Sequence, residues 1–137
     1  MSQAAAKLHN RAGDQAIEIV DRCCAAFNAH DVEGILSDFA DDAVWLLSIG
    51  PTPEGRRLVG KAAIGEVLRS RFRDIPDMAW KVHRHFASGN VVCSEWTVTG
   101  TPKNGAPIDW LGIDIWELDG GKIVKKDTYW KQVVKPA

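Results

Sequence analysis

The chain of 137 residues is short of several features that mark specialised classes of protein. It has only three cysteines, two of them adjacent at Cys23 and Cys24, and no CxxC spacing, so neither a disulfide framework nor a structural zinc site is expected. Basic and acidic side chains nearly cancel, at 17 against 18, so the field that attracts nucleic acid or anionic lipid is missing. We predict no metal and no nucleic-acid partner.

Long apolar runs are absent as well. No stretch approaches the roughly 18 consecutive apolar residues of a membrane span, and residues 1–10 lack the apolar segment of a secretory signal. No glycine-rich phosphate-binding pattern occurs, so no nucleotide cofactor is indicated. We therefore expect a cytoplasmic protein with no membrane partner and no cofactor, and its length fits a single domain of about 100 to 150 residues.

Tryptophan, in contrast, is in excess: the chain has six, against one tyrosine. Tryptophan is the largest and most costly side chain to place in a small domain. The excess therefore needs a structural explanation, and we predict that most of these rings surround a cavity.

Apolar spacing predicts three helices after a leader. Residues 1–13 are Ala-rich and polar, and form either a loose leader or the frayed start of a helix. A first amphipathic helix is predicted over 14–29, because apolar positions recur three and four residues apart: Ile17, Val20, Cys24 and Phe27. After a tight turn, Asp31 suits the N-cap of a short second helix. A third helix is predicted over 61–73.

The remaining segments have strand-like patterns. One strand is predicted early, over 43–49, and four more follow the third helix: 79–87, 91–100, 106–118 and 122–134. Turns that contain glycine separate the last four, which is typical of an antiparallel meander. This order predicts an α+β domain over 14–137, with a curved, mostly antiparallel sheet wrapped around the N-terminal helices.

Several short motifs, spread along almost the whole chain, occur in a combination that is typical of one group of proteins. They are Phe27-Asn28-Ala29-His30-Asp31, Phe39-Ala40-Asp41-Asp42-Ala43-Val44-Trp45, Gly60, Gly121-Lys122-Ile123 and Tyr129-Trp130. The pattern resembles the SnoaL-like group in the superfamily of nuclear transport factor 2, ketosteroid isomerase and limonene epoxide hydrolase. The resemblance implies a cystatin-like cone with an apolar pocket, and commonly a homodimer through the outer sheet face. It leaves the activity open among isomerase, cyclase, hydrolase and dehydratase.

The catalytic residues of ketosteroid isomerases carry over only in part. Their proton-shuttling Asp falls at Leu47 and their hydrogen-bonding Tyr at Cys23, whereas their second acid falls at Asp114. The acid/base Asp of polyketide cyclases in the group is also placed at Asp114. The resemblance to either group therefore places a catalytic acid at Asp114.

The catalytic set of limonene epoxide hydrolases is incomplete too. The Arg and Asp of their middle strand fall at Glu95 and Thr97. The Asp of their last strand falls near Thr128, one residue from Asp127.

Counting residues along the predicted strands indicates a candidate pair independently of the resemblance. If Asn104 and Gly105 are the two central residues of a hairpin turn, Glu95 lies opposite Asp114 on one face. Opposed carboxylates about 5 Å apart repel and tend to share a proton, which tunes an acid/base pair. Alternatively, one of them faces a lysine or solvent and does no chemistry. The same face is predicted to carry Thr97, Trp110, Gly112 and Trp116.

The opposite face of these two strands is also apolar, with Trp96, Val98, Leu111, Ile113 and Ile115. One face should cover the helices, so the other is expected to meet a second subunit in a homodimer.

The length of the turn before the last strand determines which residue of that strand is the third candidate for the site. A two-residue Gly120-Gly121 turn would point Asp127 into the cavity, whereas a three-residue loop would place Thr128 there. His83 and His85 lie two apart and should share a face, which allows a metal site with Glu95 as third ligand, although spacing does not show that a third ligand converges. The alternatives are ordinary half-buried or surface residues, or a proton relay beside the acids.

Two functions fit these patterns. The first is a cofactor-independent acid/base enzyme, an isomerase, cyclase, dehydratase or hydrolase of a small apolar cyclic or polyketide-like compound. Its catalytic residues are predicted to be Asp114, Glu95 and Asp127, in a pocket lined by Trp45, Leu47, Thr97, Trp110, Trp116, Thr128 and Trp130. The alternative is a non-catalytic module that binds an apolar ligand or a partner chain.

Overall fold

The computed structural model describes residues 3–136, with side chains from residue 12 onward. Its helices are α1 (Gln3–Asn28), α2 (Val32–Ser37) and α3 (Lys61–Asp74). Its strands are β1 (Phe39–Leu46), β2 (Arg57–Val59), β3 (Ala79–Ser88), β4 (Val91–Gly100), β5 (Ile108–Asp119) and β6 (Lys122–Trp130).

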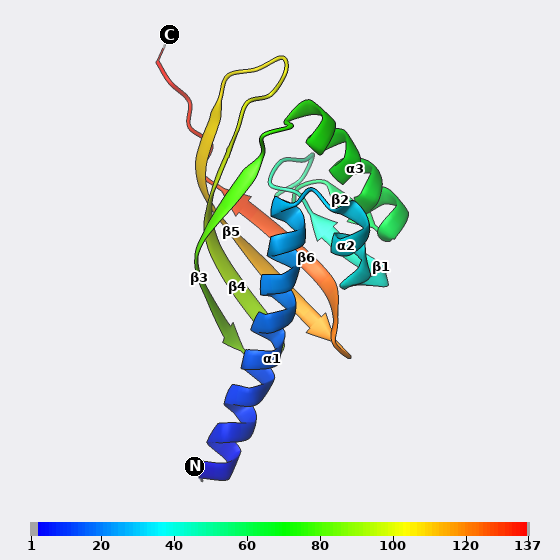
Figure 1. Cartoon of the computed structure of the whole chain (residues 1–137), viewed down its shortest axis with the longest axis vertical. Coiled ribbons are helices and arrows are strands. Elements are labelled where there is room, and N and C mark those ends of the chain that lie inside the picture. Colours follow the sequence, from blue (N-terminus) through cyan, green and yellow to red (C-terminus); the bar gives the residue numbers. More distant parts are fainter. Residues whose placement is uncertain (1–2, 137) are drawn as a thin grey trace.

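The strands form one curved sheet in the order β2-β1-β6-β5-β4-β3, antiparallel throughout except for the β1–β6 pair (Figure 1). Helix α1 packs across the concave face, and α3 lies beside the sheet at the end where the C-terminus emerges. The predicted α+β class, with a curved sheet around the helices, is confirmed. Within residues 3–136, no helix combines the length and apolar character needed to cross a bilayer.

Helix α1 is longer than its apolar stripe suggested. It begins at Gln3, so the part of the predicted leader that the structure describes is helical, and this part extends beyond the sheet in Figure 1. The buried stripe is Ala16, Val20, Cys23 and Phe27. The predicted members Ile17 and Cys24 flank it and are half-buried.

The turn into α2 follows the prediction. Asp31 is the N-cap, and its carboxylate accepts a hydrogen bond of 3.0 Å from the Gly34 amide. The early strand begins at Phe39, four residues before the predicted start. The three-residue strand β2 was not predicted, because a segment that follows two prolines has too few residues to show an alternating pattern.

The register between β4 and β5 differs from the predicted one by a single residue. The ladder ends at the pair Gly100–Ile108, so residues 101–107 form a loop and not a two-residue hairpin at Asn104-Gly105. Pro107 has no N–H to extend the ladder, and the Lys103 amide instead donates to the Asp74 carbonyl. The predicted opposition of Glu95 and Asp114 is therefore wrong: Glu95 faces Ile113, and Asp114 faces Ser94.

Two β-bulges change which side chains point inward. One lies at His83, between the pairs Val82–Trp96 and Arg84–Glu95. It separates the two histidines, because His83 bonds Thr97 on the outer face whereas His85 bonds Ser94 on the inner face. The prediction that they share a face is wrong.

The other bulge lies in β6, at the residue between the pairs Glu117–Lys125 and Leu118–Ile123. The turn before it has two residues, as in the first alternative, since Asp119 pairs with Lys122. The bulge nevertheless adds one position, so Thr128 lies opposite Asp114 and Asp127 lies opposite Ile115 on the outer face.

Candidate functional site

A polar cluster lies at the centre of the concave face, surrounded by aromatic rings. Its centre is Asp114, which is 4% exposed. Its carboxylate accepts three side-chain hydrogen bonds, from Trp96 Nε1 at 2.9 Å, Thr128 Oγ1 at 2.6 Å and Lys126 Nζ at 2.9 Å. Asp114 is thus a buried carboxylate whose charge is matched by a cation and two neutral donors.

Lys126 is the partner of this acid. Its ammonium group also donates to Thr128 Oγ1 at 3.0 Å, and only 4% of the residue is exposed. Three rings enclose the ammonium, with centroids 4.5 Å from Nζ for Trp45 and 5.1 Å for Phe27 and Trp116. Cation–π attraction therefore replaces part of the hydration that this ammonium lost on burial.

A second chain of hydrogen bonds starts beside the first. Trp116 Nε1 donates to Ser94 Oγ at 3.0 Å, and His85 Nδ1 lies 2.7 Å from the same oxygen. His85 Nε2 lies 3.1 Å from the exposed carboxylate of Asp21 on α1. A polar path thus runs from the surface of α1 to Ser94, the cross-strand neighbour of Asp114.

The space left beside the Asp114–Lys126 pair is small. The cavity has a volume of about 20 Å³ and is lined by Cys24, Phe27, Trp80, Val82, Trp96, Asp114, Trp116 and Lys126. A water molecule needs about 10 to 15 Å³ measured in this way, so the cavity has room for about one.

The predicted site residues divide between the two faces of the sheet. The concave face holds Asp114, Trp45, Trp110, Trp116, Thr128 and Trp130. The outer face holds Glu95, Thr97 and Asp127. Leu47 follows the end of β1 and packs, half-buried, against the main core.

The two outer carboxylates have surface partners. Glu95 forms an ion pair of 3.3 Å with Arg84. Asp127 accepts a hydrogen bond of 3.2 Å from the Tyr129 hydroxyl, and the negative charge of Asp127 raises the pKa of that phenol. Neither carboxylate touches the concave cluster.

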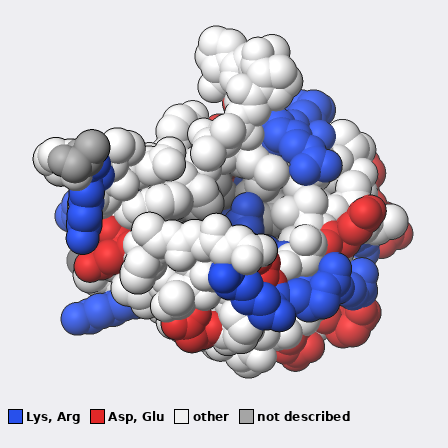
Figure 2. Space-filling model, turned by 90° about the horizontal axis from the view of Figure 1, so that it is seen from above, with Lys and Arg blue, Asp and Glu red and all other residues white. Residues whose placement is uncertain are grey.

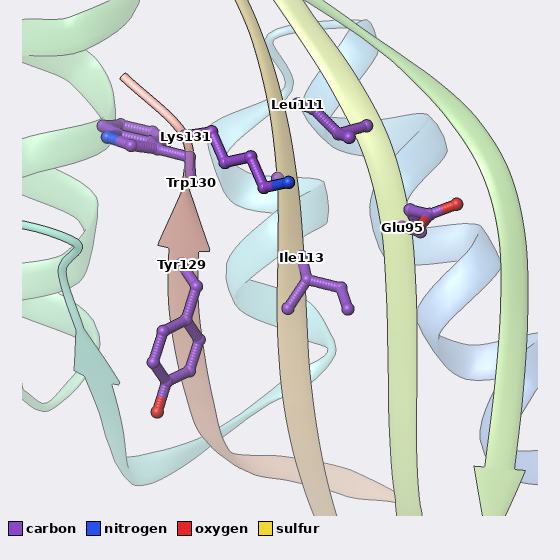
Figure 3. A pocket seen from close by; sticks show the side chains of 7 residues that line it. Glu95, Leu111, Ile113, Tyr129, Trp130 and Lys131 are labelled. Atoms are coloured by element: carbon purple, nitrogen blue, oxygen red, sulfur yellow. The ribbon is translucent and has the colours of Figure 1, made fainter. Parts of the chain in front are cut away.

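A wider hollow of about 230 Å³ lies on the outer face (Figure 3). It is lined by Glu95, Leu111, Gly112, Ile113, Tyr129, Trp130 and Lys131. The outer face thus offers more open space than the concave one does next to Asp114.

Sequence reasoning missed Lys126, Trp96 and Ser94 in the concave cluster. A lysine in a strand is usually solvated, so its residue type gave no signal. The signal was the alternation in β6, where Lys126, Thr128 and Trp130 lie two apart and share a face. Trp96 and Ser94 were missed because the predicted register placed the side chains of β4 on the wrong faces of the sheet.

The titratable groups at the centre of the site are one carboxylate and one ammonium, joined by hydrogen bonds. Within the described residues, no three His, Cys, Asp or Glu side chains come together as a metal site would require. Burial raises the pKa of the Cys24 thiol to about 12 and that of Cys23 well above its usual value, so neither is a nucleophile at neutral pH.

The fold is shared with solved structures of several activities. A limonene epoxide hydrolase-like protein from M. tuberculosis has 21% identity and a TM-score of 0.71, over 87% of this chain and 84% of the other. A putative polyketide cyclase from Xanthomonas campestris has 24% identity and a TM-score of 0.72, over 88% and 93%.

A hypothetical protein with a ketosteroid isomerase-like fold from Catenulispora acidiphila, solved in complex with trimethylamine, has 19% identity and a TM-score of 0.72, over 82% of this chain and 84% of the other. At these identities the likeness shows the fold alone. No curated protein matches the chain at a significant level. The family model of the SnoaL-like domain matches residues 20–126, which is most of the chain. The protein therefore belongs to the SnoaL-like family, as its motifs indicated.

Proposed function

We propose that the protein is a cofactor-independent acid/base enzyme acting on a small apolar compound, with Asp114 as the proton-transferring group and Lys126 as its charge partner. The observation that carries this proposal is the Asp114–Lys126 pair, two charged groups buried together among aromatic rings. Burying a pair of charges costs several kcal/mol per ion, and well-packed apolar residues often serve stability as well or better. A function that needs the charges explains why they are there.

Each group of the cluster has a role in the proposed reaction. Asp114 accepts a proton from the substrate or from water and returns it to another atom of the product, so the reaction consumes no cofactor. Lys126 and the Trp96 indole hold the carboxylate in place through hydrogen bonds to its two oxygens. Glu95 and Asp127 lie on the outer face and take no part in the proposed mechanism.

The size of the cavity narrows the reaction class. Room for about one water molecule beside the pair favours addition or removal of water, as in a hydrolase or dehydratase, over rearrangement of a large enclosed ring. The substrate then contacts the pair from the aromatic side, where Trp80 and Val82 are only half-buried. We place the enzyme in the cytoplasm, since its cysteines Cys23, Cys24 and Cys93 are all free thiols.

The test uses a panel of small cyclic epoxides and α,β-unsaturated ketones in water enriched in ¹⁸O. Wild type is expected to turn over at least one compound and to place one ¹⁸O atom in the product. Asp114→Asn should lower kcat by about 100-fold or more, the effect of losing a general acid or base. Asp109→Asn is the matched control, because Asp109 lies on the outer face of the same strand, and its kcat should be unchanged.

The outcome that contradicts the proposal is equal turnover by wild type and Asp114→Asn. Circular dichroism checks that the variant is folded, because it leaves the Lys126 ammonium without its charge partner. Compounds that quench tryptophan fluorescence but are not converted would favour the alternative, a non-catalytic binding module. The open hollow on the outer face is the observation that supports this alternative.

The protein is also proposed to be a homodimer through the outer sheet face. Leu111 and Tyr129 are 41% and 54% exposed there, beside the half-buried Ile113 and Ile115. In the hollow on this face, Glu95 lies on β4, and the Lys131 side chain extends from the end of β6 toward β5 (Figure 3). A two-fold axis through this face could bring each charge to the opposite charge of the second copy.

A further inference from the structure

A second group of polar side chains, on α3 and at the end of β6, is not explained by the acid/base pair. Arg71 on α3 extends between two rings, with its guanidinium carbon 5.2 Å from the Trp45 centroid and 5.7 Å from the Trp130 centroid. Trp130 points away from the outer hollow, toward the side on which α3 lies (Figure 3). Arg71 and Trp130 therefore meet on the inner side of the sheet.

Both side chains are donors without acceptors. Trp130 Nε1 is buried and has no hydrogen-bond partner among the described residues. The guanidinium of Arg71 forms no hydrogen bond or ion pair with the side chains that the structure describes, and burial lowers its pKa against the weaker opposing effect of the Asp114 charge. A buried donor without an acceptor is unfavourable, and this applies to Trp130 Nε1. Arg71 is half-buried, so its guanidinium can meet an acceptor supplied from outside.

A groove along α3 is lined in part by Arg71. It has a volume of about 410 Å³ and is lined by Arg56, Val67, Ser70, Arg71, Asp74 and Ile75. Figure 2 shows the end of the molecule between α3 and the sheet as a hollow with a basic group at its base and mostly uncharged atoms around it. The groove is large enough for a ligand of one or two rings.

We propose that this groove binds the carboxylate of a small organic acid with an apolar ring body, and that Arg71 is its main anchor. A planar guanidinium matches a carboxylate with two parallel hydrogen bonds. Val67 and Ile75 offer apolar contact to the body of the ligand. Asp74 in the same groove repels a second negative charge, which favours a monoanion over a dianion such as HPO₄²⁻.

Trp130 adds a further donor. Its indole lies beside the Arg71 guanidinium and its N–H has no partner, so a carboxylate held by Arg71 is close to a second donor. The binding step does not depend on turnover. Identifying the bound acid as the substrate of Asp114 rests on the proposed function.

The experiment measures binding of 2-naphthoate at pH 7 by calorimetry, with 2-naphthalenemethanol as the neutral analogue and inorganic phosphate as a second anion. Wild type is expected to bind naphthoate at least about tenfold more tightly than the alcohol, the usual value of a charge-assisted hydrogen bond. Arg71→Gln should remove this preference, and Trp130→Phe should weaken naphthoate binding by several-fold. Arg73→Gln is the matched control, since Arg73 is exposed on the same helix, and its affinity should equal that of wild type.

A structural role for Arg71 makes a different prediction from a ligand-binding role. Arg71→Gln removes the contacts of the guanidinium with the Trp45 and Trp130 rings, so a small loss in Tm is expected with either role. Only a ligand-binding role also removes the preference for naphthoate over the neutral alcohol in the folded variant. Equal naphthoate affinity in wild type and Arg71→Gln would overturn the proposal, and so would the same loss in Arg73→Gln or phosphate binding as tight as naphthoate binding. Asp114→Asn separates the two proposals, because it should end turnover while the naphthoate affinity stays within about threefold of wild type.

Discussion

Lys126 is the residue whose position departs most from what its type suggests. Lysines are almost never fully buried unless they are paired, and this one is paired with Asp114 inside three aromatic rings. Alternation in β6 places it on the inner face, but its burial depends on residues from three other elements, α1, β1 and β5, which no local pattern shows.

Removing the ammonium should therefore be costly. Lys126→Met leaves the Asp114 carboxylate buried without its cation and is expected to lower the free energy of unfolding by about 3 to 5 kcal/mol, measured in urea. Lys125→Met is the control, because Lys125 lies on the outer face of the same strand and forms only a partly exposed pair with Glu117; a change within about 1 kcal/mol is expected there.

The double variant Lys126→Met/Asp114→Asn tests the coupling. Its loss should be smaller than the sum of the two single losses, because no charge is left unpaired. A loss below about 1 kcal/mol for Lys126→Met alone would show that the pair is not buried in solution.

The thiols give a pH-dependent prediction. Since burial raises the pKa of Cys23 and Cys24 in the folded state, protonated thiols stabilise the fold below about pH 8.5, the usual cysteine pKa. This stability should be lost as the pH rises toward about 12, the folded pKa of Cys24. At pH 8, a disulfide reagent should modify at most Cys93 in the native protein and all three thiols in guanidinium chloride. Rapid native reaction at Cys24 would contradict the buried position.

At the scale of elements, single-residue shifts in β3 to β6 decide what the sheet presents to α1. Gly112 on β5 has a specific part in this, because the Trp96 ring lies across it. A Cβ at Gly112 would come within 2.4 Å of that ring and 2.9 Å of the Tyr129 carbonyl. The absence of a side chain there lets the indole reach Asp114.

Gly112→Ala should therefore destabilise the sheet. We expect a loss of about 1 to 3 kcal/mol in the free energy of unfolding from overpacking, together with a changed tryptophan emission spectrum. Gly105→Ala is the control in an exposed loop, where a Cβ would come no closer than 3.4 Å to Pro102, and should be nearly neutral. Equal stability of the two variants would mean that the Trp96 ring does not lie on Gly112.

At the scale of the whole molecule, the sheet separates two environments. The concave side holds buried charges in a nearly filled interior, and the outer side holds an exposed apolar face with an open hollow. The proposed chemistry belongs to the first side and the proposed dimer to the second.

The dimer can be tested by light scattering. Wild type should have about twice the chain mass of 15.1 kDa, and Ile113→Lys should shift it toward the monomer, because a charge would be buried at the centre of the contact. Ile49→Lys is the control, since Ile49 is 63% exposed in a loop outside this face. A monomeric wild type at 100 µM would refute the dimer.

Most of the fold follows from the sequence because its signals are local. Helical spacing located α1 and α3, alternation located β3 to β6, and the motifs identified the family. The inward side of β5, with Trp110, Gly112, Asp114 and Trp116, was also predicted correctly, since a single strand alternates regardless of its neighbours.

The tertiary structure decided how the strands meet, and with that the composition of the site. One extra residue in each of two bulges, and a longer loop before β5, turned Glu95, Thr97 and Asp127 outward and brought Trp96 and Thr128 to Asp114. Such shifts depend on hydrogen bonds to distant segments, as from Lys103 to Asp74, which no local pattern records. The few cysteines, the balanced charge and the many tryptophans were visible in the sequence. Two indoles donate hydrogen bonds to Thr128 and Asp114 of the acid–lysine cluster and a third donates to the neighbouring Ser94, and these bonds depend on contacts between strands.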